Sequence, residues 1–514
     1  MKKFVLILVI GFFVGNSFAR NKVTINADSA KIQISKHIYG HFAEHIGGVI
    51  YDGIFVGKDN SDIPNTAGVR NDIIQALKDL HIPNLRWPGG CFADTYHWKD
   101  AIGPEEERKP IENLSWGNYR EDNSFGTHEF LNLCELLGAE PYLAVNMNTG
   151  TVQEAVEWVQ YTTHANGSSY LTDLREKYGR SKPWKVKYWG IGNESWDCGG
   201  DMTVDYYINL YKRYATAMTT YFNTEKLFRI AVGPGLPDYD WTEKIMKNIP
   251  ARRFEGVSIH HYAVNWEHKS SSYEFTEEEY FTTMEKAWFM EEFVTKNSEV
   301  MDKYDPEKRV ALIVDEWGGW YDRDPRGEGA LYQQNTIRDA MIAGLTLNIF
   351  NNHADRVRMA NLAQTVNALQ SVILTKEEKM ILTPTYHVME MYKVHQDALL
   401  VPLQVASEDF VLGDRKIQAV SVSASIDKSD KMHISLTNID NKNSQKVEIS
   451  LKGYKAKNVK GRILTSPEVQ DHNTFENPSK VAPQSFNKAT FSSDNLIVNM
   501  PPNSVVVLEL EKKY

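Results

Sequence analysis

The sequence has little of several features that would place it in other classes of protein. Its 514 residues include only three cysteines, Cys91, Cys134 and Cys198, and their spacing matches no zinc-binding pattern. Asp and Glu (67) outnumber Lys and Arg (57), and the net charge of −10 argues against the basic surface that nucleic acid requires. The apolar run Phe4–Val14 is too short to span a membrane, and no second span follows it. We therefore expect no nucleic-acid partner and no membrane anchor.

Several catalytic motifs are missing as well. No G-x-S-x-G supplies the nucleophile elbow of a serine hydrolase. No G-x-x-x-x-G-K-[ST] supplies a phosphate-binding loop. His260 and His261 are adjacent, but H-E-x-x-H does not occur and neighbouring residues of a strand face opposite sides, so we predict no metal site. Serine-hydrolase, phosphate and metal chemistry therefore lack their usual motifs.

The N-terminus has the pattern of a secretory signal peptide. Lys2 and Lys3 precede the apolar run, and residues 17–19 place small side chains at positions −3 and −1 of a cleavage site. We expect residues 1–19 to be removed and the mature protein to be secreted or periplasmic. At least one cysteine is then unpaired, and Cys134, on the apolar face of a predicted helix, is expected in the core.

Between residues 38 and 396, short apolar runs alternate with amphipathic helical segments. Eight such strand–helix units predict a parallel sheet, and eight is the number that closes a (β/α)8 barrel. An open, doubly wound sheet is the alternative, but no G-x-G-x-x-G opens a helix after the first strand. We therefore predict an α/β protein built on a TIM barrel. The predicted strands are Ile38–Phe42, Asn84–Trp87, Pro141–Asn146, Val186–Gly192, Arg229–Gly233, Gly256–His260, Val310–Val314 and Asn348–Phe350.

Beyond residue 400 the pattern changes to alternating strands separated by polar, Pro-containing turns. This predicts a C-terminal antiparallel β-sandwich, jelly-roll-like in type. The segment Lys22–Ser35 also alternates, and we expect it to join the sandwich. The predicted organisation is a signal peptide (1–19), N-terminal strands (20–36), a catalytic barrel (37–396) and the sandwich (397–514). The predicted sandwich strands are Ala419–Ile426, Met432–Asn438, Lys446–Leu451, Leu496–Met500 and Val505–Leu510.

Two glutamates directly follow apolar strands of the predicted barrel. Glu194 follows the fourth strand and Glu316 the seventh, so they can face each other across the end of the barrel where functional side chains gather. Two carboxyls about 5 to 5.5 Å apart suit double displacement at an acetal carbon. A solvated loop glutamate is the simpler interpretation, but both glutamates lie among Asn and Trp in stretches poor in other charge. We predict a retaining glycoside hydrolase.

The residues near the two glutamates suggest which one is the nucleophile and which one is the acid. Arg86, at the end of the second strand, is the best candidate to keep Glu316 ionised as the nucleophile. Repulsion from that charge helps Glu194 to keep its proton as the acid. Asn193 is placed to hydrogen-bond a sugar hydroxyl beside the anomeric carbon.

Taken in order, five blocks of sequence resemble the α-L-arabinofuranosidases of glycoside hydrolase family 51. The G-N-E block alone marks many barrel glycosidases, whereas the ordered set is highly specific. The resemblance extends from about residue 23 to the C-terminus. The blocks are Ile38–His45, Leu85–Asp94, Gly192–Glu194, Asp315–Trp317 and Ala360–Gln364.

The resemblance implies roles for individual residues. Glu194 is the acid/base and Glu316 the nucleophile, with Arg86 supporting it. Cys91 follows R-W-P-G-G at a position that is Asn in some members, so a hydrogen bond carried over from Asn is in doubt there. The loops 98–108 and 317–329 are expected to shape the leaving-group side. The residues implied to contact the bound furanose are Glu44, Asn193, Tyr262 and Gln364.

The resemblance also implies an activity. We expect an exo-acting enzyme that removes terminal non-reducing arabinofuranosyl groups from arabinan, arabinoxylan or their oligosaccharides, without a cofactor and as a trimer or hexamer. The alternatives are a retaining endo-β-glucanase or xylanase that uses the same two carboxyls, and a non-catalytic carbohydrate-binding protein.

Overall fold

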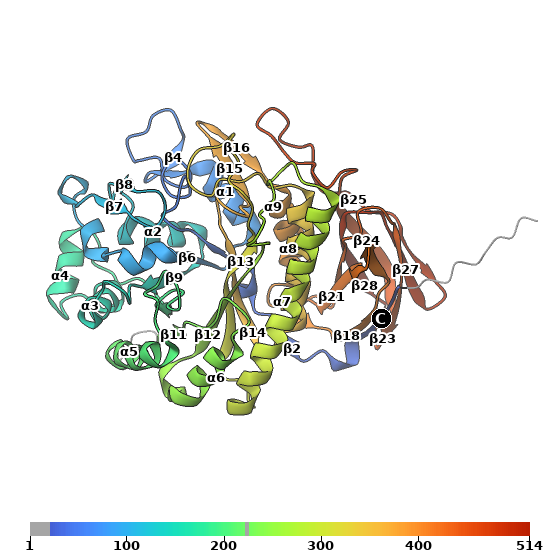
Figure 1. Cartoon of the computed structure of the whole chain (residues 1–514), viewed down its shortest axis with the longest axis horizontal. Helices are drawn as coiled ribbons and strands as arrows, with labels where there is room; N and C mark the ends of the chain where they lie inside the picture. Colours follow the sequence, from blue (N-terminus) through green and yellow to red (C-terminus); the bar gives the residue numbers. More distant parts are fainter. Residues whose placement is uncertain (1–20, 221–225, 514) are drawn as a thin grey trace, which may run out of the picture.

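The computed structural model describes residues 21–220 and 226–513 and consists of a barrel beside a sheet-rich C-terminal part (Figure 1). Eight parallel strands close the barrel in the order β10-β11-β12-β13-β14-β3-β6-β9. The predicted fold class, a (β/α)8 barrel with a C-terminal β-sandwich, is confirmed. The barrel strands are β3 (Gly40–Phe42), β6 (Asn84–Trp87), β9 (Glu140–Val145), β10 (Tyr188–Ile191), β11 (Phe228–Ala231), β12 (Gly256–Ala263), β13 (Ala311–Gly319) and β14 (Val357–Ala363).

The barrel strands are buried on both faces, which is why they appear in the sequence as nearly continuous apolar runs. Side chains fill the interior of the barrel, so the barrel is a packed core and not a pore. One interior cluster consists of Tyr142, Tyr188, Ile230, Ala311, Ile313 and Met359.

The predicted eighth strand is wrong. Residues 348–350 lie inside helix α8 (Ile337–Asn352), and the eighth strand is β14, which follows it. Helix α8 lies between the barrel and the C-terminal sheets, and its residues from Ile337 to Asn351 are all buried (Figure 1). A helix that is buried all round shows no polar face, so its sequence cannot be told from a buried strand by periodicity.

The remaining helices cover the outside of the barrel or connect it to the sandwich. Several begin with side-chain caps: the Thr276 hydroxyl accepts a hydrogen bond from the Glu279 amide, and the Glu279 carboxylate accepts one from the Thr276 amide. None of the described helices is long and apolar enough to cross a membrane. Their bounds are α1 (Asn71–Leu80), α2 (Thr127–Leu137), α3 (Val152–Thr163), α4 (Tyr170–Lys177), α5 (Val204–Ala217), α6 (Tyr239–Asn248), α7 (Glu277–Tyr304) and α9 (Pro384–Tyr392).

The C-terminal part contains two larger sheets. One has the order β18-β1-β23-β27-β26 and the other β2-β17-β21-β22-β28-β24-β25. Strand β1 (Asn21–Asn26), from the start of the described chain, lies between β18 and β23. The other bounds are β2 (Ile32–Gln33), β17 (Leu399–Leu400), β18 (Leu403–Ala406), β21 (Val420–Ile426), β22 (Met432–Asn438), β23 (Gln445–Lys452), β24 (Ala456–Thr465), β25 (Gln484–Ser485), β26 (Ala489–Ser492), β27 (Asn495–Met500) and β28 (Ser504–Lys512).

A neutral polar network joins the barrel to the sandwich. The two ring nitrogens of His395 lie 2.7 Å from Ser425 Oγ and 2.6 Å from Ser435 Oγ. Ser423 Oγ accepts a hydrogen bond from Asn351 Nδ2 of α8 (3.1 Å). These side chains are fully buried, and each has a hydrogen-bond partner across the interface.

Candidate active site

Glu194 and Glu316 converge at the carboxyl ends of the barrel strands. Glu316 lies in β13, and Glu194 follows β10 with a backbone φ of +37°, a left-handed conformation that is costly for a residue with a Cβ. A carboxyl oxygen of one lies within 4.8 Å of a carboxyl oxygen of the other. Retaining glycosidases hold their carboxyls about 5 to 5.5 Å apart, whereas inverting enzymes need about 6.5 to 9.5 Å. The geometry therefore suits direct attack by one carboxyl.

Arg86 of β6 lies against Glu316. Its Nη1 donates to Glu316 Oε1 (2.7 Å) and its Nη2 to Asn193 Oδ1 (2.6 Å). The second oxygen, Glu316 Oε2, accepts a hydrogen bond from the hydroxyl of Tyr262 (2.8 Å). Both oxygens of Glu316 thus accept hydrogen bonds, one of them from a buried cation.

Glu194 has a different environment. Burial and then the charge of Glu316 raise its pKa, and a hydrogen bond from His260 opposes that rise. The Nδ1 of His260 lies 2.8 Å from Glu194 Oε1. The side chain of Glu194 is 17% exposed and that of Glu316 8%, so Glu194 is the more accessible of the two. A carboxyl with a raised pKa, next to one whose two oxygens accept hydrogen bonds from Arg86 and Tyr262, suits a general acid beside a nucleophile.

Glu44 and Gln364, which the sequence predicted as sugar contacts, lie together on one side of this pair. Gln364 Nε2 donates to Glu44 Oε2 (3.1 Å), and the amides of Gly90 and Phe92 donate to Glu44 Oε1 at 3.0 and 3.1 Å. Burial and then the charge of Glu316 raise the pKa of Glu44 to about 7. Gly90 allows the side chain of Glu316 to approach the backbone closely, because a Cβ at Gly90 would lie 2.8 Å from Glu316 Oε1.

Trp116 is a further site residue that the sequence analysis missed. It lies between β7 (Ile111–Asn113) and β8 (Tyr119–Glu121), and its Nε1 donates to Glu44 Oε1 (2.9 Å). The hairpin follows the second barrel strand and folds back onto the first. No pattern in the neighbouring sequence indicates the contact between Trp116 and Glu44, because it depends on where the β7–β8 hairpin packs in the folded chain.

Asp94 was also missed, although it belongs to the second sequence block. Its Oδ2 accepts a hydrogen bond from the Asn193 amide (3.1 Å), and its Oδ1 accepts one from the Met147 amide (2.7 Å). Asp94 therefore joins the loops that follow β6, β9 and β10. It is fully buried, and burial raises its pKa to about 7.

Cys91 forms a disulfide with Cys198, and Cys134 is free and buried, as predicted for the core. The disulfide joins the loop after β6 to the loop that carries Glu194. The Sγ of Cys198 lies 3.6 Å from Glu194 Oε2. Cys91 thus takes part in the site through its sulfur. The sequence had left the pairing of the three cysteines open.

Aromatic side chains extend outward from Tyr262. The ring of Trp320 meets that of Tyr262 edge to face at 5.1 Å, and the ring of Trp266 meets that of Trp320 at 5.2 Å. Trp266 is 56% exposed. Trp320 belongs to the loop 317–329 that was expected on the leaving-group side, whereas Trp266, after β12, was not anticipated.

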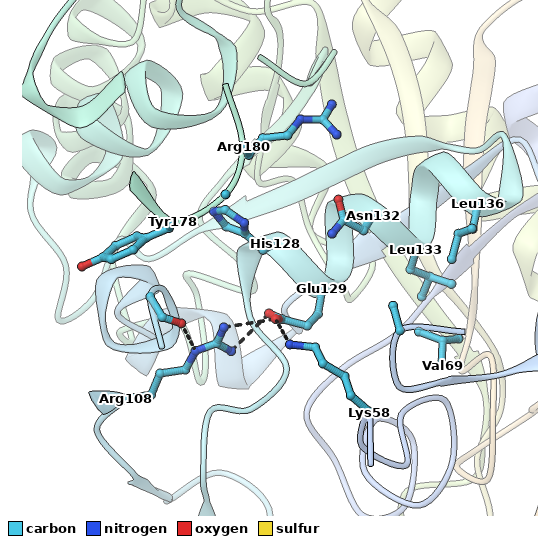
Figure 2. Close-up of a pocket in the computed structure, with 13 residues that line it drawn as sticks. Lys58, Val69, Arg108, His128, Glu129, Asn132, Leu133, Leu136, Tyr178 and Arg180 are labelled. Carbon is cyan, nitrogen blue, oxygen red and sulfur yellow. Dashed lines mark hydrogen bonds and ion pairs between the residues drawn. The ribbon is translucent and has the colours of Figure 1, made fainter. Parts of the chain in front are cut away.

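The loop 98–108 packs against α3 and lines a cavity beside α2. Trp98 is buried and stacks on Trp158, and Gly103 and Arg108 line a different cavity of about 350 Å³ beside α2 (Figure 2). In this cavity Arg108 pairs with Glu129, which Lys58 also approaches (Figure 2). None of the residues that line it belongs to the carboxyl cluster.

Comparison with known proteins identifies the family. Residues 76–280 match the α-L-arabinofuranosidase 1 domain, and residues 315–504 match the α-L-arabinofuranosidase C-terminal domain. An exo-α-L-arabinofuranosidase of Bacteroides ovatus is 49% identical over 95% of each chain. The chain belongs to the family 51 α-L-arabinofuranosidases. This family is the one that the five sequence blocks indicated, and its membership makes the chain a glycoside hydrolase.

Solved structures of the family agree. A family 51 arabinofuranosidase of Xanthomonas axonopodis pv. citri is 43% identical, with a TM-score of 0.93 over 96% of this chain and 100% of that one. An α-L-arabinofuranosidase of Thermotoga maritima, solved as an arabinose complex, is 31% identical, with a TM-score of 0.84 over the same shares. Membership in this family does not favour the endo-β-glucanase, xylanase or non-catalytic alternatives.

The expectation of a secreted or periplasmic protein is wrong. The Bacteroides ovatus relative, similar over nearly the whole chain, is named an intracellular enzyme. The predicted signal peptide, residues 1–19, lies outside the described residues. Two lysines before a short apolar run are a compositional pattern, and here that pattern misled the prediction of location.

Proposed function

We propose that the protein is a retaining, exo-acting α-L-arabinofuranosidase that acts by double displacement. One observation carries the proposal: two carboxyls within 4.8 Å of each other have opposite electrostatic settings. Glu316 is held by Arg86 and Tyr262, while burial raises the pKa of Glu194. The arrangement provides an ionised nucleophile next to a protonated acid.

In the first step Glu316 attacks the anomeric carbon of the arabinofuranosyl group. The bond to the leaving oxygen breaks as Glu194 transfers its proton to that oxygen, and a covalent glycosyl-enzyme forms. Once Glu316 is esterified its negative charge is gone, so one cause of the raised pKa of Glu194 disappears. Glu194 can then remain ionised and act as the base.

In the second step Glu194 takes a proton from water. The water oxygen attacks the same anomeric carbon, and Glu316 leaves as a carboxylate, which Arg86 is placed to receive. Two displacements at one carbon restore the starting configuration.

The sugar contacts follow from the same geometry. Glu44, Gln364 and Asn193 surround the carboxyl pair and present oxygens and amide groups to a furanose. The Trp116 hairpin reaches Glu44 and narrows the site, which supports removal of a single terminal sugar. Trp320 and Trp266 lie beyond Tyr262 and offer aromatic faces to the sugars of the leaving group.

An activity comparison tests the proposal. We expect rapid release of 4-nitrophenol from 4-nitrophenyl α-L-arabinofuranoside and no loss of viscosity in a β-glucan solution. Arabinan and arabinoxylan oligosaccharides should lose one arabinose at a time, so arabinose and a product shortened by one sugar should appear together at early times. Early products shortened by two or more sugars would contradict exo action. The family resemblance also leads us to expect a trimer or hexamer, which light scattering can decide.

A further inference from the structure

His260, in β12, is held between carboxyl groups of two other barrel segments. Its Nδ1 lies 2.8 Å from Glu194 Oε1, and its Nε2 lies 2.9 Å from Asp315 Oδ1. Glu316 Oε2 lies 3.6 Å from the same Nδ1. The histidine is 5% exposed. The two displacement steps do not use this residue, although it touches both catalytic candidates.

The positions of these oxygens define the protonation of the ring. An imidazole that lies between two carboxyl groups can donate a hydrogen to each of them, and it is then a cation. Burial opposes that charge, but the negative charges of Glu316 and Asp315 raise the pKa of His260 to about 10. The Nδ1–H of His260 is therefore donated to Glu194 Oε1.

This hydrogen bond determines which oxygen of Glu194 carries the catalytic proton. Oε1 accepts from His260, so the proton lies on Oε2. Oε2 faces the sulfur of Cys198 at 3.6 Å, and a disulfide sulfur has no hydrogen to donate to it. The proton-bearing oxygen thus has only this sulfur, a weak acceptor, beside it, and its hydrogen is available to the leaving group.

The positive charge of His260 also helps Glu194 to act as the acid in the first step and as the base in the second. Burial and the charge of Glu316 favour the protonated acid, and the bond from His260 favours the carboxylate. An acid that must become a base in the second step needs both influences, because a carboxyl held protonated at every working pH cannot accept the proton of water.

We infer that His260 is a positioning residue for Glu194, which directs the catalytic proton to Oε2 and keeps the carboxyl able to release and recover it. Asp315 Oδ1 forms an ion pair with the far nitrogen of the ring at 2.9 Å. The inference rests on the proposed function, since it requires Glu194 to be the acid/base.

The groups around His260 allow a specific expectation for pH dependence. Arg86, Tyr142 and Tyr262 bond to carboxylates and not to the ring of His260, so their contacts survive its replacement. The charged and titratable neighbours are Glu194 after β10, Asp315 and Glu316 in β13, Arg86 in β6, Tyr142 in β9 and Tyr262 in β12.

The test compares pH profiles of kcat/KM for 4-nitrophenyl α-L-arabinofuranoside. In His260→Gln the amide can still donate a hydrogen bond, but the positive charge is lost, so the pKa of Glu194 should rise and the basic limb should move to higher pH. We expect kcat to fall about tenfold or more, with KM falling alongside, because the second step lacks its base and the glycosyl-enzyme accumulates. Asp315→Asn should move the basic limb in the same direction.

Two controls separate the possible outcomes. His261→Gln alters the neighbouring histidine, whose Nε2 bonds to the Lys286 carbonyl on α7 (2.7 Å), and should leave the basic limb in place. Glu194→Gln should remove the basic limb. If Glu194→Gln keeps the basic limb, the proposed acid/base assignment fails and the inference fails with it. If Glu194→Gln behaves as expected but neither His260→Gln nor Asp315→Asn moves the limb, the inference alone is overturned.

Discussion

Two buried polar networks in this molecule differ in charge. At the carboxyl end of the barrel strands, Arg86 and His260 lie among the carboxyls of Glu44, Glu194 and Glu316, and burial raises the pKa of the first two. Between the barrel and the sandwich, a neutral histidine is held by two serine hydroxyls. Burial lowers the pKa of that histidine, His395, to about 3.

The difference shows how burial is used in each place. A neutral network in which every group has a partner fixes the position of two packed elements and does no chemistry. Buried carboxyls that lie close together repel one another when they are ionised, and nearby cations offset this repulsion. Such an unfavourable electrostatic free energy is typical of a catalytic site. We therefore expect changes in the first network to act on rate and changes in the second to act on stability.

The largest expected effect is that of Glu316→Ala. Removal of the nucleophile should lower kcat by roughly 10⁴- to 10⁶-fold, with little change in the free energy of unfolding. Added azide should restore product formation, because it can attack the anomeric carbon in the space left by the side chain. The rescued product should have inverted stereochemistry by NMR. A rescued product with retained stereochemistry would contradict the assignment of Glu316.

Glu194→Ala should have a smaller effect that depends on the leaving group. For poor leaving groups the first step should slow by about 10²- to 10⁴-fold, because these groups need protonation as they depart. Aryl arabinofuranosides with very acidic phenols should be nearly spared in that step, which pre-steady-state release of the phenol measures. Equal slowing for all phenols would mean that Glu194 is not the acid.

Arg86→Lys keeps the positive charge but removes the planar guanidinium, which donates to two partners at once. One guanidinium contacts both Glu316 and Asn193, and an ammonium cannot reach both with the same geometry. We expect kcat/KM to fall about 100-fold, which is about 2.7 kcal/mol of transition-state stabilisation. An unchanged rate would remove Arg86 from the site.

His395→Ala tests the other half of the comparison. It leaves a cavity and two serine hydroxyls without their partner, so the free energy of unfolding should fall by about 2 to 4 kcal/mol while kcat/KM stays within about twofold. Denaturant unfolding and initial rates measure the two quantities. His268→Ala, at a residue whose side chain is 79% exposed, is the matched control and should change neither.

The lowered pKa of His395 leads us to expect that the free energy of unfolding depends on pH. The folded pKa of His395 is about 3, below the ordinary value of 6.5, so the unfolded chain binds more protons between these values. The contribution of neutral His395 is complete above pH 6.5 and is lost as the pH falls toward 3. His41, also buried with a pKa lowered to about 3, acts in the same window. His395→Ala should therefore lose less stability on acidification than the parent, and a parallel loss in both proteins would contradict this account.

Features that depend on neighbouring residues in the chain could be predicted from the sequence. Glu194 and Glu316 follow apolar strands directly, so the end of the barrel at which they lie follows from strand order alone. Arg86 was found for the same reason. The strand-end positions also brought out Glu44 and Asn193, although their role as sugar contacts came from the family resemblance.

Features that depend on packing between distant segments could not be predicted. Trp116 reaches Glu44 only because its hairpin folds back over the site, and Cys91 meets Cys198 only once two loops converge. The last turn of helix α8, residues 348–350, was mistaken for a strand because the sandwich covers the face that would otherwise be polar. The intermediate position of His260 between Glu194 and Asp315 likewise requires three segments to be placed together.

The stereochemistry of the first product tests the central claim most directly. Hydrolysis of 4-nitrophenyl α-L-arabinofuranoside can be followed by proton NMR in the first minutes, before the released sugar mutarotates. If Glu316 bonds to the sugar while Glu194 carries the proton, α-L-arabinofuranose appears first. First appearance of the β anomer would mean that water attacks directly, and it would contradict the mechanism.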